Sequence, residues 1–318
     1  MESKHSLLFK TLVVVLIPFV ILGAGLPLCF RQRGFSADKI ASNLEYREAW
    51  EVESMSDKEH EAFVHEVFSQ PFYYLDSGQQ CYAFVSEDQK YVLKFFKMHH
   101  LLPKMWLNHF PFSLFESCRF NHVEKKQQFL EATFNSLKSA YDHLRNETGL
   151  LYIHLNKSRC LKQKVDVIGR RGERYSIDLD SKEFILQRKA DLLFPHLLGL
   201  IEKGEDQRVH QCIRSLLQTV VVRCRSKFAD QGIGVRYNYG FIDDQAVIID
   251  CGHFVLDESL IYPHNYQREI LRVTSAIDQW AQRHCPDLVP IVQLEAQQWI
   301  NAIQQFAPTP VEARDSGT

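Results

Sequence analysis

Residues 230–252 read DQGIGVRYNYGFIDDQAVIIDCG, and this stretch decides how the rest of the chain is interpreted. Apolar runs lie on both sides of Asp243-Asp244, a pair that favours a turn, so the stretch predicts a β-hairpin. Asn238 stands before the first strand of this hairpin and Asp250 follows the second. The hairpin would therefore bring one amide and one carboxylate onto adjoining backbone segments. Such oxygen ligands are suited to magnesium.

This pairing resembles the end of the protein-kinase catalytic loop and the DFG motif that follows it, with Asn238 as the loop asparagine and Asp250 as the DFG aspartate. In that family the catalytic aspartate stands five residues before the asparagine, where this chain has Ile233. The nearest upstream acid is Asp230. Either Asp230 reaches the site through a longer loop, or the chain has no catalytic base. A hairpin whose Asn and Asp only form turns is the alternative.

A lysine is the second feature of interest, within residues 72–97, where strand-like runs alternate with turns at residues 76–80 and 87–89. Lys94, in the sequence YVLK, resembles the lysine of the kinase VAIK motif, which steadies the α- and β-phosphates of ATP. Gly78 would then lie in the turn that covers the phosphates, although the full GxGxxG pattern is absent. The alternative is an ordinary hairpin with an exposed lysine.

An amphipathic helix is predicted over residues 121–145, because apolar residues recur there every three or four positions. It stands where a kinase has its αC helix, whose glutamate pairs with the phosphate-binding lysine. The resemblance makes Glu131 the partner of Lys94. Glu124 and Glu147 are the substitutes, and a solvated glutamate on the helix surface is the alternative.

The run FILQRKADLL at residues 184–193 leads from a strand into a helical region. In kinases the backbone of the corresponding segment binds the edge of the adenine. The resemblance therefore implies that residues 187–190, including Gln187 and Lys189, bind the nucleobase.

The complete pattern predicts an α+β chain, similar to the two-lobed protein-kinase fold, behind an N-terminal membrane segment. Strands are expected at residues 150–155, in a hairpin at 164–179 and at the beginning of the run 184–193, and further helices at 209–228, 266–284 and 292–306. The expected units are an N-terminal tail (1–10), a transmembrane anchor or signal peptide (11–30), a linker (31–55), a small β-rich lobe with one long helix (56–190), a helical lobe with the hairpin (191–306) and a disordered tail (307–318).

The composition gives ordinary globular proportions, with 318 residues, a net charge of −2 and 24% charged residues. This balance gives no reason to expect a nucleic-acid partner. The eight cysteines are scattered without a CxxC pair, which argues against a structural zinc site and against a disulfide framework in so long a chain. A reducing compartment is the better interpretation.

The uncharged run at residues 11–30 is long enough to cross a bilayer as a helix. More Lys and Arg residues follow it than precede it, which predicts a single-pass protein with its main domain in the cytoplasm. Two features instead favour a main domain on the non-cytoplasmic side of the membrane. The run could be a signal peptide cleaved near Gly25, and the sequons at Asn146 and Asn156 could carry glycans.

These features together indicate an atypical membrane-anchored kinase-like protein that binds ATP and Mg²⁺. The resemblance implies transfer of phosphate to a hydroxyl of a protein, sugar or lipid. A pseudokinase, or a membrane-tethered interaction module without catalysis, is the alternative, because the HRD sequence is missing and the phosphate-covering turn is poor in glycine.

Overall fold

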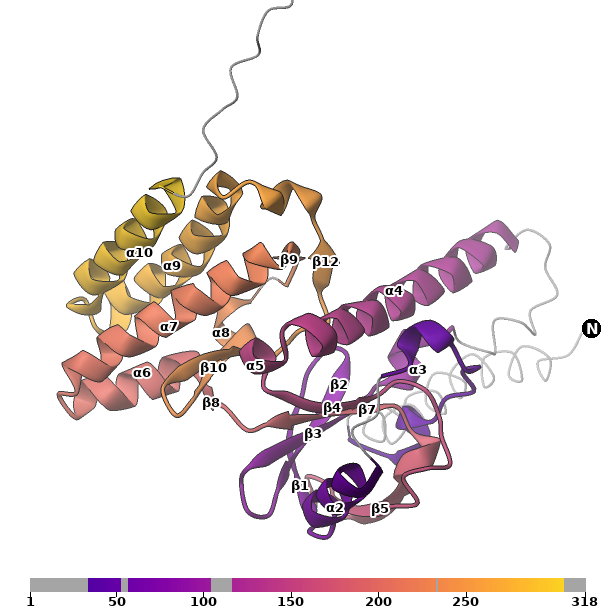
Figure 1. Cartoon of the computed structure of the whole chain (residues 1–318). Coiled ribbons are helices and arrows are strands. Elements are labelled where there is room, and N and C mark those ends of the chain that lie inside the picture. The colour runs from indigo at the N-terminus through magenta and orange to yellow at the C-terminus, as the bar shows by residue number, and fades with distance from the viewer. Residues whose placement is uncertain (1–33, 53–56, 104–115, 233, 306–318) are drawn as a thin grey trace, which may run out of the picture.

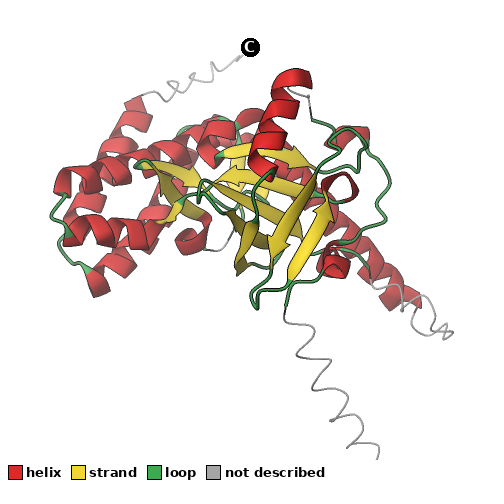
Figure 2. Cartoon of the chain, turned by 90° about the horizontal axis from the view of Figure 1, so that it is seen from below, coloured by secondary structure: helices red, strands yellow, loops and turns green. Residues whose placement is uncertain are grey.

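The structure, a computed structural model, describes residues 34–52, 57–103, 116–232 and 234–305. It is a mixed α+β chain in which a large sheet lies beside a group of helices (Figures 1 and 2). Within the described ranges, no helix is both long enough and apolar enough to cross a membrane. The expected anchor at residues 11–30 and the expected tail at 307–318 lie outside these ranges.

The large sheet has seven strands in the order β4-β7-β3-β2-β1-β5-β6. Its strands are β1 (Phe72–Ser77), β2 (Cys81–Ser86), β3 (Tyr91–Phe96), β4 (Leu150–His154), β5 (Lys164–Ile168), β6 (Arg174–Asp178) and β7 (Phe184–Arg188). Neighbours pair antiparallel except β1 and β5, which are parallel. The strands and turns predicted between residues 72 and 97, and the hairpin predicted at 164–179, are confirmed.

One face of this sheet is closed by α2 (Asp57–Phe68). Val67 and Phe68 of α2 are buried against sheet residues such as Phe84 and Phe184. The burial alternates along β5 in the way that a strand with one face on the core requires.

The helical group surrounds a second, larger core that extends to α4 (Glu116–His143). Its main helices are α6 (Leu193–Glu202), α7 (Asp206–Arg225), α9 (His264–His284) and α10 (Leu288–Gln305). The short elements of this part are α5 (Arg145–Thr148), β8 (Asp191–Leu192), β9 (Phe228–Asp230), α8 (Val235–Asn238), β10 (Tyr239–Ile242), β11 (Gln245–Ile248), β12 (Phe254–Leu256) and the 3₁₀ turn η6 (Glu258–Ile261). Two further short elements follow strands of the large sheet: α3 (Met98–Leu101) after β3 and the 3₁₀ turn η5 (Leu179–Ser181) after β6. The predicted helices are confirmed, each with slightly different ends.

Helix α4 connects the two parts of the molecule (Figure 1). It packs against β4 of the large sheet and against β12 in the helical part. The predicted apolar stripe on this helix is buried, including Leu130, Phe134 and Leu137. Helix α4 therefore contacts both the large sheet and the segment that follows Asp250.

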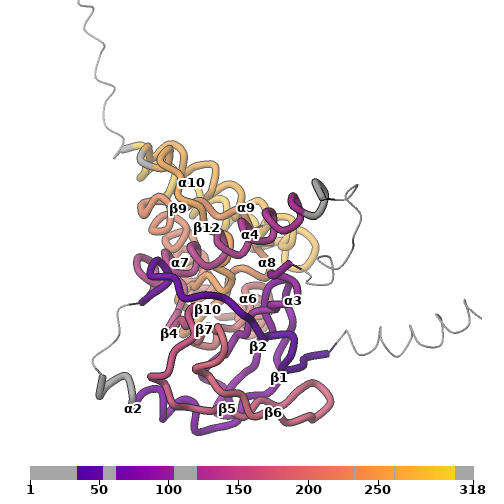
Figure 3. Tube along the Cα trace, turned by 90° about the vertical axis from the view of Figure 1, so that its right-hand side faces the viewer, coloured from indigo at the N-terminus to yellow at the C-terminus, as the bar shows by residue number. Residues whose placement is uncertain are grey.

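Residues 34–52, called the strap from here on, run across one side of the molecule (Figure 3). The strap contains the 3₁₀ turns η1 (Ala37–Ile40) and η2 (Glu48–Trp50). Asn156 fixes it in place, because its side chain accepts from Arg47 N at 3.0 Å and donates to Arg47 O at 2.8 Å. The amide of this sequon is therefore used inside the fold, and Asn156 is only 8% exposed.

Candidate functional site

The predicted hairpin is formed by β10 and β11, which pair antiparallel with the turn at Asp243 and Asp244. Both turn residues have positive φ, 51° and 61°, as tight hairpin turns require. Just beyond the hairpin's open end, Ile249 N donates to Asn238 O at 2.7 Å. The hairpin thus brings Asn238 next to the residue that precedes Asp250, as the sequence predicted.

The side chain of Lys94 extends from β3 to Ile249, the residue before Asp250. Its ammonium donates to the carbonyl oxygen of Ile249 at 2.7 Å. A lysine from the large sheet therefore lies one residue from Asp250, although the two residues are far apart in sequence. Among the described residues, Lys94 forms no ion pair with a carboxylate, so the charge on its ammonium remains available to an anion.

Asp230 joins this region through a second pair of strands. It ends β9, which pairs antiparallel with β12, so that Asp230 lies opposite Phe254. Gln231 N also donates to His253 O at 3.1 Å. The segment after Asp250 and the segment after Asp230 are therefore neighbours.

Gly232 is the residue around which Asp230 and Asn238 meet. A Cβ atom built on Gly232 would lie 2.4 Å from Asn238 Nδ2 and 2.8 Å from Asp230 Oδ1. Gly232 N donates to Asp230 Oδ1 at 2.8 Å. The absence of a side chain is therefore what allows the carboxylate and the amide to approach this backbone. Gly232 was not predicted as a site residue, although a glycine two residues after an acid is a signal for such a turn.

The carboxylate of Asp230 is enclosed by an ionic network in the helical part. Arg272 Nη2 lies 3.2 Å from Asp230 Oδ2 and 3.3 Å from Glu269 Oε2, and the buried Arg223 contacts Glu269 at 2.8 Å. Burial acts to raise the pKa of Glu269, but the two guanidinium groups outweigh it and keep that pKa below its ordinary value. The side chain of Asp230 is 0% exposed. A general base must reach its proton, so this arrangement opposes direct catalysis by Asp230 unless the pair with Arg272 opens.

Asn238 and Asp250 differ from Asp230 because they keep unused oxygens. Asn238 is 7% exposed, yet no described residue hydrogen-bonds to its side-chain amide. Asp250 accepts one hydrogen bond, from Gly252 N at 3.3 Å, and forms no ion pair among the described residues. The donor set of one carboxylate and one amide oxygen fits a hard cation such as Mg²⁺.

The expected ion pair between Lys94 and Glu131 is not formed, and this prediction was wrong. Glu131 pairs with Arg47 of the strap at 2.7 Å. Hydrogen bonds from Arg47 and Gln127 hold the pKa of Glu131 below its ordinary value. Glu131 therefore lies on the side of α4 that faces the strap, away from the sheet lysine.

Ser136 and Gln80 contact the segment that follows Asp250 instead, and neither residue was predicted as part of the site. Ser136 Oγ donates to Cys251 O at 2.5 Å and accepts from Phe254 N at 2.6 Å. Gln80 Nε2 lies 3.4 Å from His253 Nε2, and its Oε1 lies 2.5 Å from where a Cβ on Gly252 would stand. No local pattern in the sequence identifies these contacts, because each joins segments more than a hundred residues apart.

The remaining predicted site residues lie on the sheet side. Gly78 is in the turn between β1 and β2, and its carbonyl accepts from the ammonium of Lys97. The side chain of Gln187 is buried and donates to Ile248 O at 3.3 Å, so it contacts the strand that leads to Asp250. Lys189 N donates to Lys90 O at 2.8 Å and is thereby already bonded. Nucleobase binding by residues 187–190 stays a prediction.

Cys81 and Cys251 lie next to the site and are both within the electrostatic reach of Lys94 and Asp250. Burial raises the pKa of each thiol to about 12. Both groups are therefore neutral thiols at physiological pH and are poor candidates for nucleophiles.

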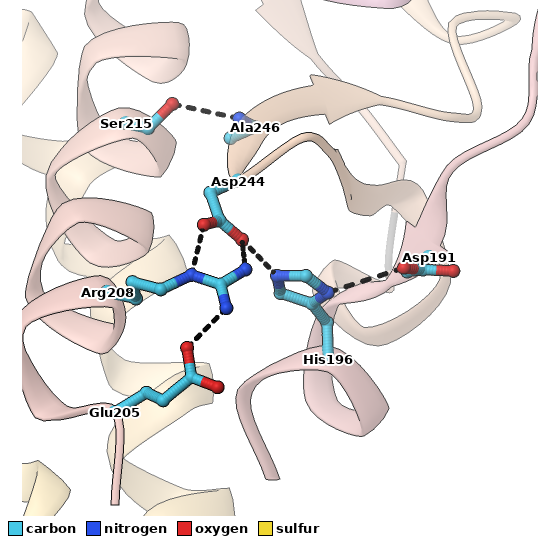
Figure 4. A network of polar contacts seen from close by, with 7 residues as sticks. All are labelled: Asp191, His196, Glu205, Arg208, Ser215, Asp244 and Ala246. Atoms are coloured by element: carbon cyan, nitrogen blue, oxygen red, sulfur yellow. Dashed lines mark hydrogen bonds and ion pairs between the residues drawn. The ribbon is translucent and has the colours of Figure 1, made fainter. Parts of the chain in front are cut away.

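A second cluster of polar residues surrounds the turn of the hairpin (Figure 4). Asp244 accepts from Arg208 Nε at 2.6 Å and lies 2.9 Å from His196 Nε2, while His196 Nδ1 lies 3.5 Å from Asp191. One ligand atom each of His196, Cys212 and Asp244 lie within 4.8 Å of one another, as a metal site would need. However, the bonds from Arg208 keep the pKa of Asp244 low and neutralise its charge. The cluster therefore suits an anchor for the hairpin turn better than a cation site.

A cavity of 440 Å³ opens between α5, α7 and the hairpin, with Arg145, Arg188 and Gln218 among its lining residues. None of Lys94, Asp230, Asn238 or Asp250 lines it. This cavity is distinct from the region in which the predicted site residues meet.

No protein-family model matches the chain, and no curated protein matches it. Among solved structures, the chain is similar to three structures of WbdD. They are a complex with the kinase inhibitor LY294002 (14% identity, TM-score 0.35), a 2.2 Å crystal structure (16% identity, TM-score 0.34) and a structure described as that of the bifunctional kinase-methyltransferase WbdD (15% identity, TM-score 0.31). The matches cover 74–75% of this chain and 45–50% of those chains, so it spans about half of their length. Likeness at this level identifies no activity for this chain.

Proposed function

We propose that this chain is an atypical kinase-like protein that binds ATP together with Mg²⁺. The order of its elements supports a two-lobed arrangement of the kinase type. Five strands (β1, β2, β3, β4 and β7), with α4 after the third, precede a helical part that carries the hairpin. The hairpin β5–β6 is an addition at the β1 edge of the same sheet.

The observation that carries the proposal is the meeting of three segments at Ile249. Its carbonyl accepts from Lys94 of the sheet, and its N–H donates to the backbone of Asn238. Asp250 follows directly. Lys94 would supply a cation for phosphate oxygens, and Asn238 and Asp250 would supply two oxygen ligands for a metal, which is the combination that phosphoryl-transfer proteins use.

Each residue has a defined part in the proposed site. Lys94 would release Ile249 and bind the α- and β-phosphates, while Asn238 and Asp250 would hold Mg²⁺. Gly78 would lie in the turn over the phosphates. The metal would supply charge neutralisation for the phosphates, and the chain's own residues would orient the nucleotide.

The alternative is a pseudokinase, a nucleotide-binding or interaction module without catalysis. A specific observation favours it: the side chain of Asp230 is fully enclosed, with one oxygen bonded to Gly232 N and the other paired with Arg272. In an active enzyme Asp230 would be the catalytic base, acting on the hydroxyl of an unidentified protein, sugar or lipid. The active kinase and a nucleotide-binding pseudokinase would share the same nucleotide site, whereas an interaction module would not need one.

Thermal unfolding with and without Mg²⁺ and ATP tests the shared site. A ligand present at about a hundred times its dissociation constant adds roughly 2.7 kcal/mol to stability, so the midpoint should rise. Asp250→Asn should remove the Mg²⁺-dependent part of this rise. Asp243→Asn is the matched control, because Asp243 lies at the far end of the same hairpin with its side chain 88% exposed. Absence of stabilisation by any nucleotide at millimolar concentration would refute the proposal.

The variant Asp230→Asn separates the enzyme from the pseudokinase. A positioned base contributes about a hundred- to ten-thousand-fold in rate. If Asp230 is that base, phosphotransfer or ATP hydrolysis should fall within this range while nucleotide affinity stays nearly constant. An unchanged rate, with only a loss of stability from the broken pair with Arg272, would favour the pseudokinase.

A further inference from the structure

We propose that α4 positions Asp250 through two hydrogen bonds of the uncharged side chain of Ser136, to Cys251 O and from Phe254 N, which together are called the clasp. We also propose that the strap stabilises the clasp by its contacts with α4. The clasp takes the place of the ion pair that Glu131 does not form. The part of the inference that concerns metal binding rests on the proposed function, whereas the clasp and its link to the strap do not.

The clasp closes the loop that follows Asp250. Ser136 Oγ donates to Cys251 O at 2.5 Å and accepts from Phe254 N at 2.6 Å, so one hydroxyl fixes both ends of the segment 251–254. Ser136 is 3% exposed. Water therefore does not readily replace either bond, and a displacement of the whole segment away from α4 would break both.

A second contact from the same helix supports the segment in its middle. Gln80 Nε2 lies 3.5 Å from Thr133 Oγ1 of α4 and 3.4 Å from His253 Nε2. Thr133 and Ser136 are three residues apart and so lie on the same face of α4. This face of the helix, directly or through Gln80, thus contacts Cys251, His253 and Phe254.

The strap contacts the same turns of α4, residues 131–135, through Arg47 and Trp50. Arg47 pairs with Glu131 at 2.7 Å, and Trp50 Nε1 donates at 3.1 Å to Asn135, the neighbour of Ser136. The ring of Trp50 also packs edge-on against Phe134 at 4.8 Å. Trp50 is 2% exposed, so this contact is part of the core. A displacement of the strap must therefore move the part of α4 that carries the clasp.

The arrangement forms a continuous physical path from the strap to Asp250. It runs from Arg47 and Trp50 to residues 131–136 of α4, and from Ser136 to the segment 251–254. Anything that pulls on or binds the strap would thereby change the position of Asp250. Ser136, Arg47 and Trp50 act on the site through other residues, so they are positioning residues.

Amide hydrogen exchange of the full chain, without nucleotide, tests the clasp directly. The N–H of Phe254 should be protected in the wild type and should exchange about tenfold faster or more in Ser136→Ala, since a buried hydrogen bond is lost. Ser139→Ala is the matched control: it makes the same change on the same helix, at a hydroxyl without a hydrogen bond among the described residues. Equal protection of Phe254 in both variants would overturn the clasp.

The double variant Arg47→Gln/Trp50→Phe tests the link to the strap. It removes the pair with Glu131 and the bond to Asn135 but keeps an aromatic ring against Phe134. Faster exchange at Phe254 is expected, while Tyr46→Phe, an exposed change in the strap, should have no effect. Unchanged exchange in the double variant would overturn the link. If Ser136→Ala does not fold, this measurement still decides the proposal.

The Mg²⁺-dependent part of ATP affinity distinguishes a positioning role of Ser136 from a purely structural role, because a structural residue would not change it selectively. Ser136→Ala should weaken the Mg²⁺-dependent part of ATP affinity about tenfold, with little change in Mg²⁺-free affinity. Equal weakening of both affinities would contradict a positioning role. If the wild-type chain binds no nucleotide, the proposed function fails, and the exchange experiments still decide the clasp by themselves.

Discussion

Replacing Gly232 by alanine is the substitution that most directly strains the candidate site. The new Cβ would lie 2.4 Å from the Asn238 amide and 2.8 Å from the Asp230 carboxylate. The amide would have to withdraw by roughly 0.6 Å even to reach 3.0 Å, and overpacking of this kind costs about 1–3 kcal/mol. Because Asn238 is a proposed metal ligand, the affinity for Mg²⁺ should fall as well, by about 10- to 100-fold if the amide is displaced.

Gly234→Ala is the matched control for this experiment. The nearest atoms to a Cβ at Gly234 are 3.9 Å away, and its φ of −116° is open to any residue. This variant should unfold within about 1 kcal/mol of the wild type and bind Mg²⁺-ATP normally. Urea unfolding gives the stability of both variants, and calorimetric titration of ATP with and without Mg²⁺ gives the affinities. Equal stability and equal Mg²⁺-ATP affinity of the two variants would refute the steric crowding at Gly232 and the proposed metal-binding role of Asn238.

Other predictions concern buried charges and the N-terminus. Glu183 is 1% exposed and accepts a hydrogen bond from Ser42 Oγ at 2.6 Å. Burial outweighs the hydrogen bonds and raises the pKa of Glu183, so its ionised form destabilises the folded chain as pH rises above the ordinary range of a glutamate. Glu183→Gln should therefore raise the unfolding midpoint at pH 7.5, with a smaller gain at pH 5; an equal gain at both pH values would contradict this. Glu269→Gln should cost about 3–5 kcal/mol in urea unfolding, because it leaves the buried charge of Arg223 poorly compensated. Deletion of residues 1–33 should release the chain from membranes, and recovery of the intact chain in the soluble fraction would contradict the anchor.

Local patterns were sufficient to predict the elements that carry the site. The hairpin followed from apolar runs around Asp243-Asp244, and its ends deliver Asn238 and Asp250 as expected. The apolar spacing along residues 121–145 likewise predicted which stripe of α4 is buried. Such patterns depend on the geometry of a single element, which the sequence encodes directly.

Contacts between distant segments could not be predicted in this way. Glu131 and Ser136 are five residues apart, which places them about 140° apart around the helix axis at 3.6 residues per turn. They therefore face different neighbours, and periodicity alone does not say which neighbour is the strap and which is the hairpin. The pairing of Arg272 with Asp230 is of the same kind, because it depends on how α9 packs.

A titration with Mn²⁺-ATP, followed through the backbone amide resonances, tests the central claim most directly. Mn²⁺ accepts the same oxygen ligands as Mg²⁺ and broadens nearby resonances. The account predicts broadening centred on residues 238–240 and 249–252, and loss of that broadening in Asp250→Asn. Broadening centred on His196 and Asp244, or none anywhere at saturating nucleotide, would contradict it.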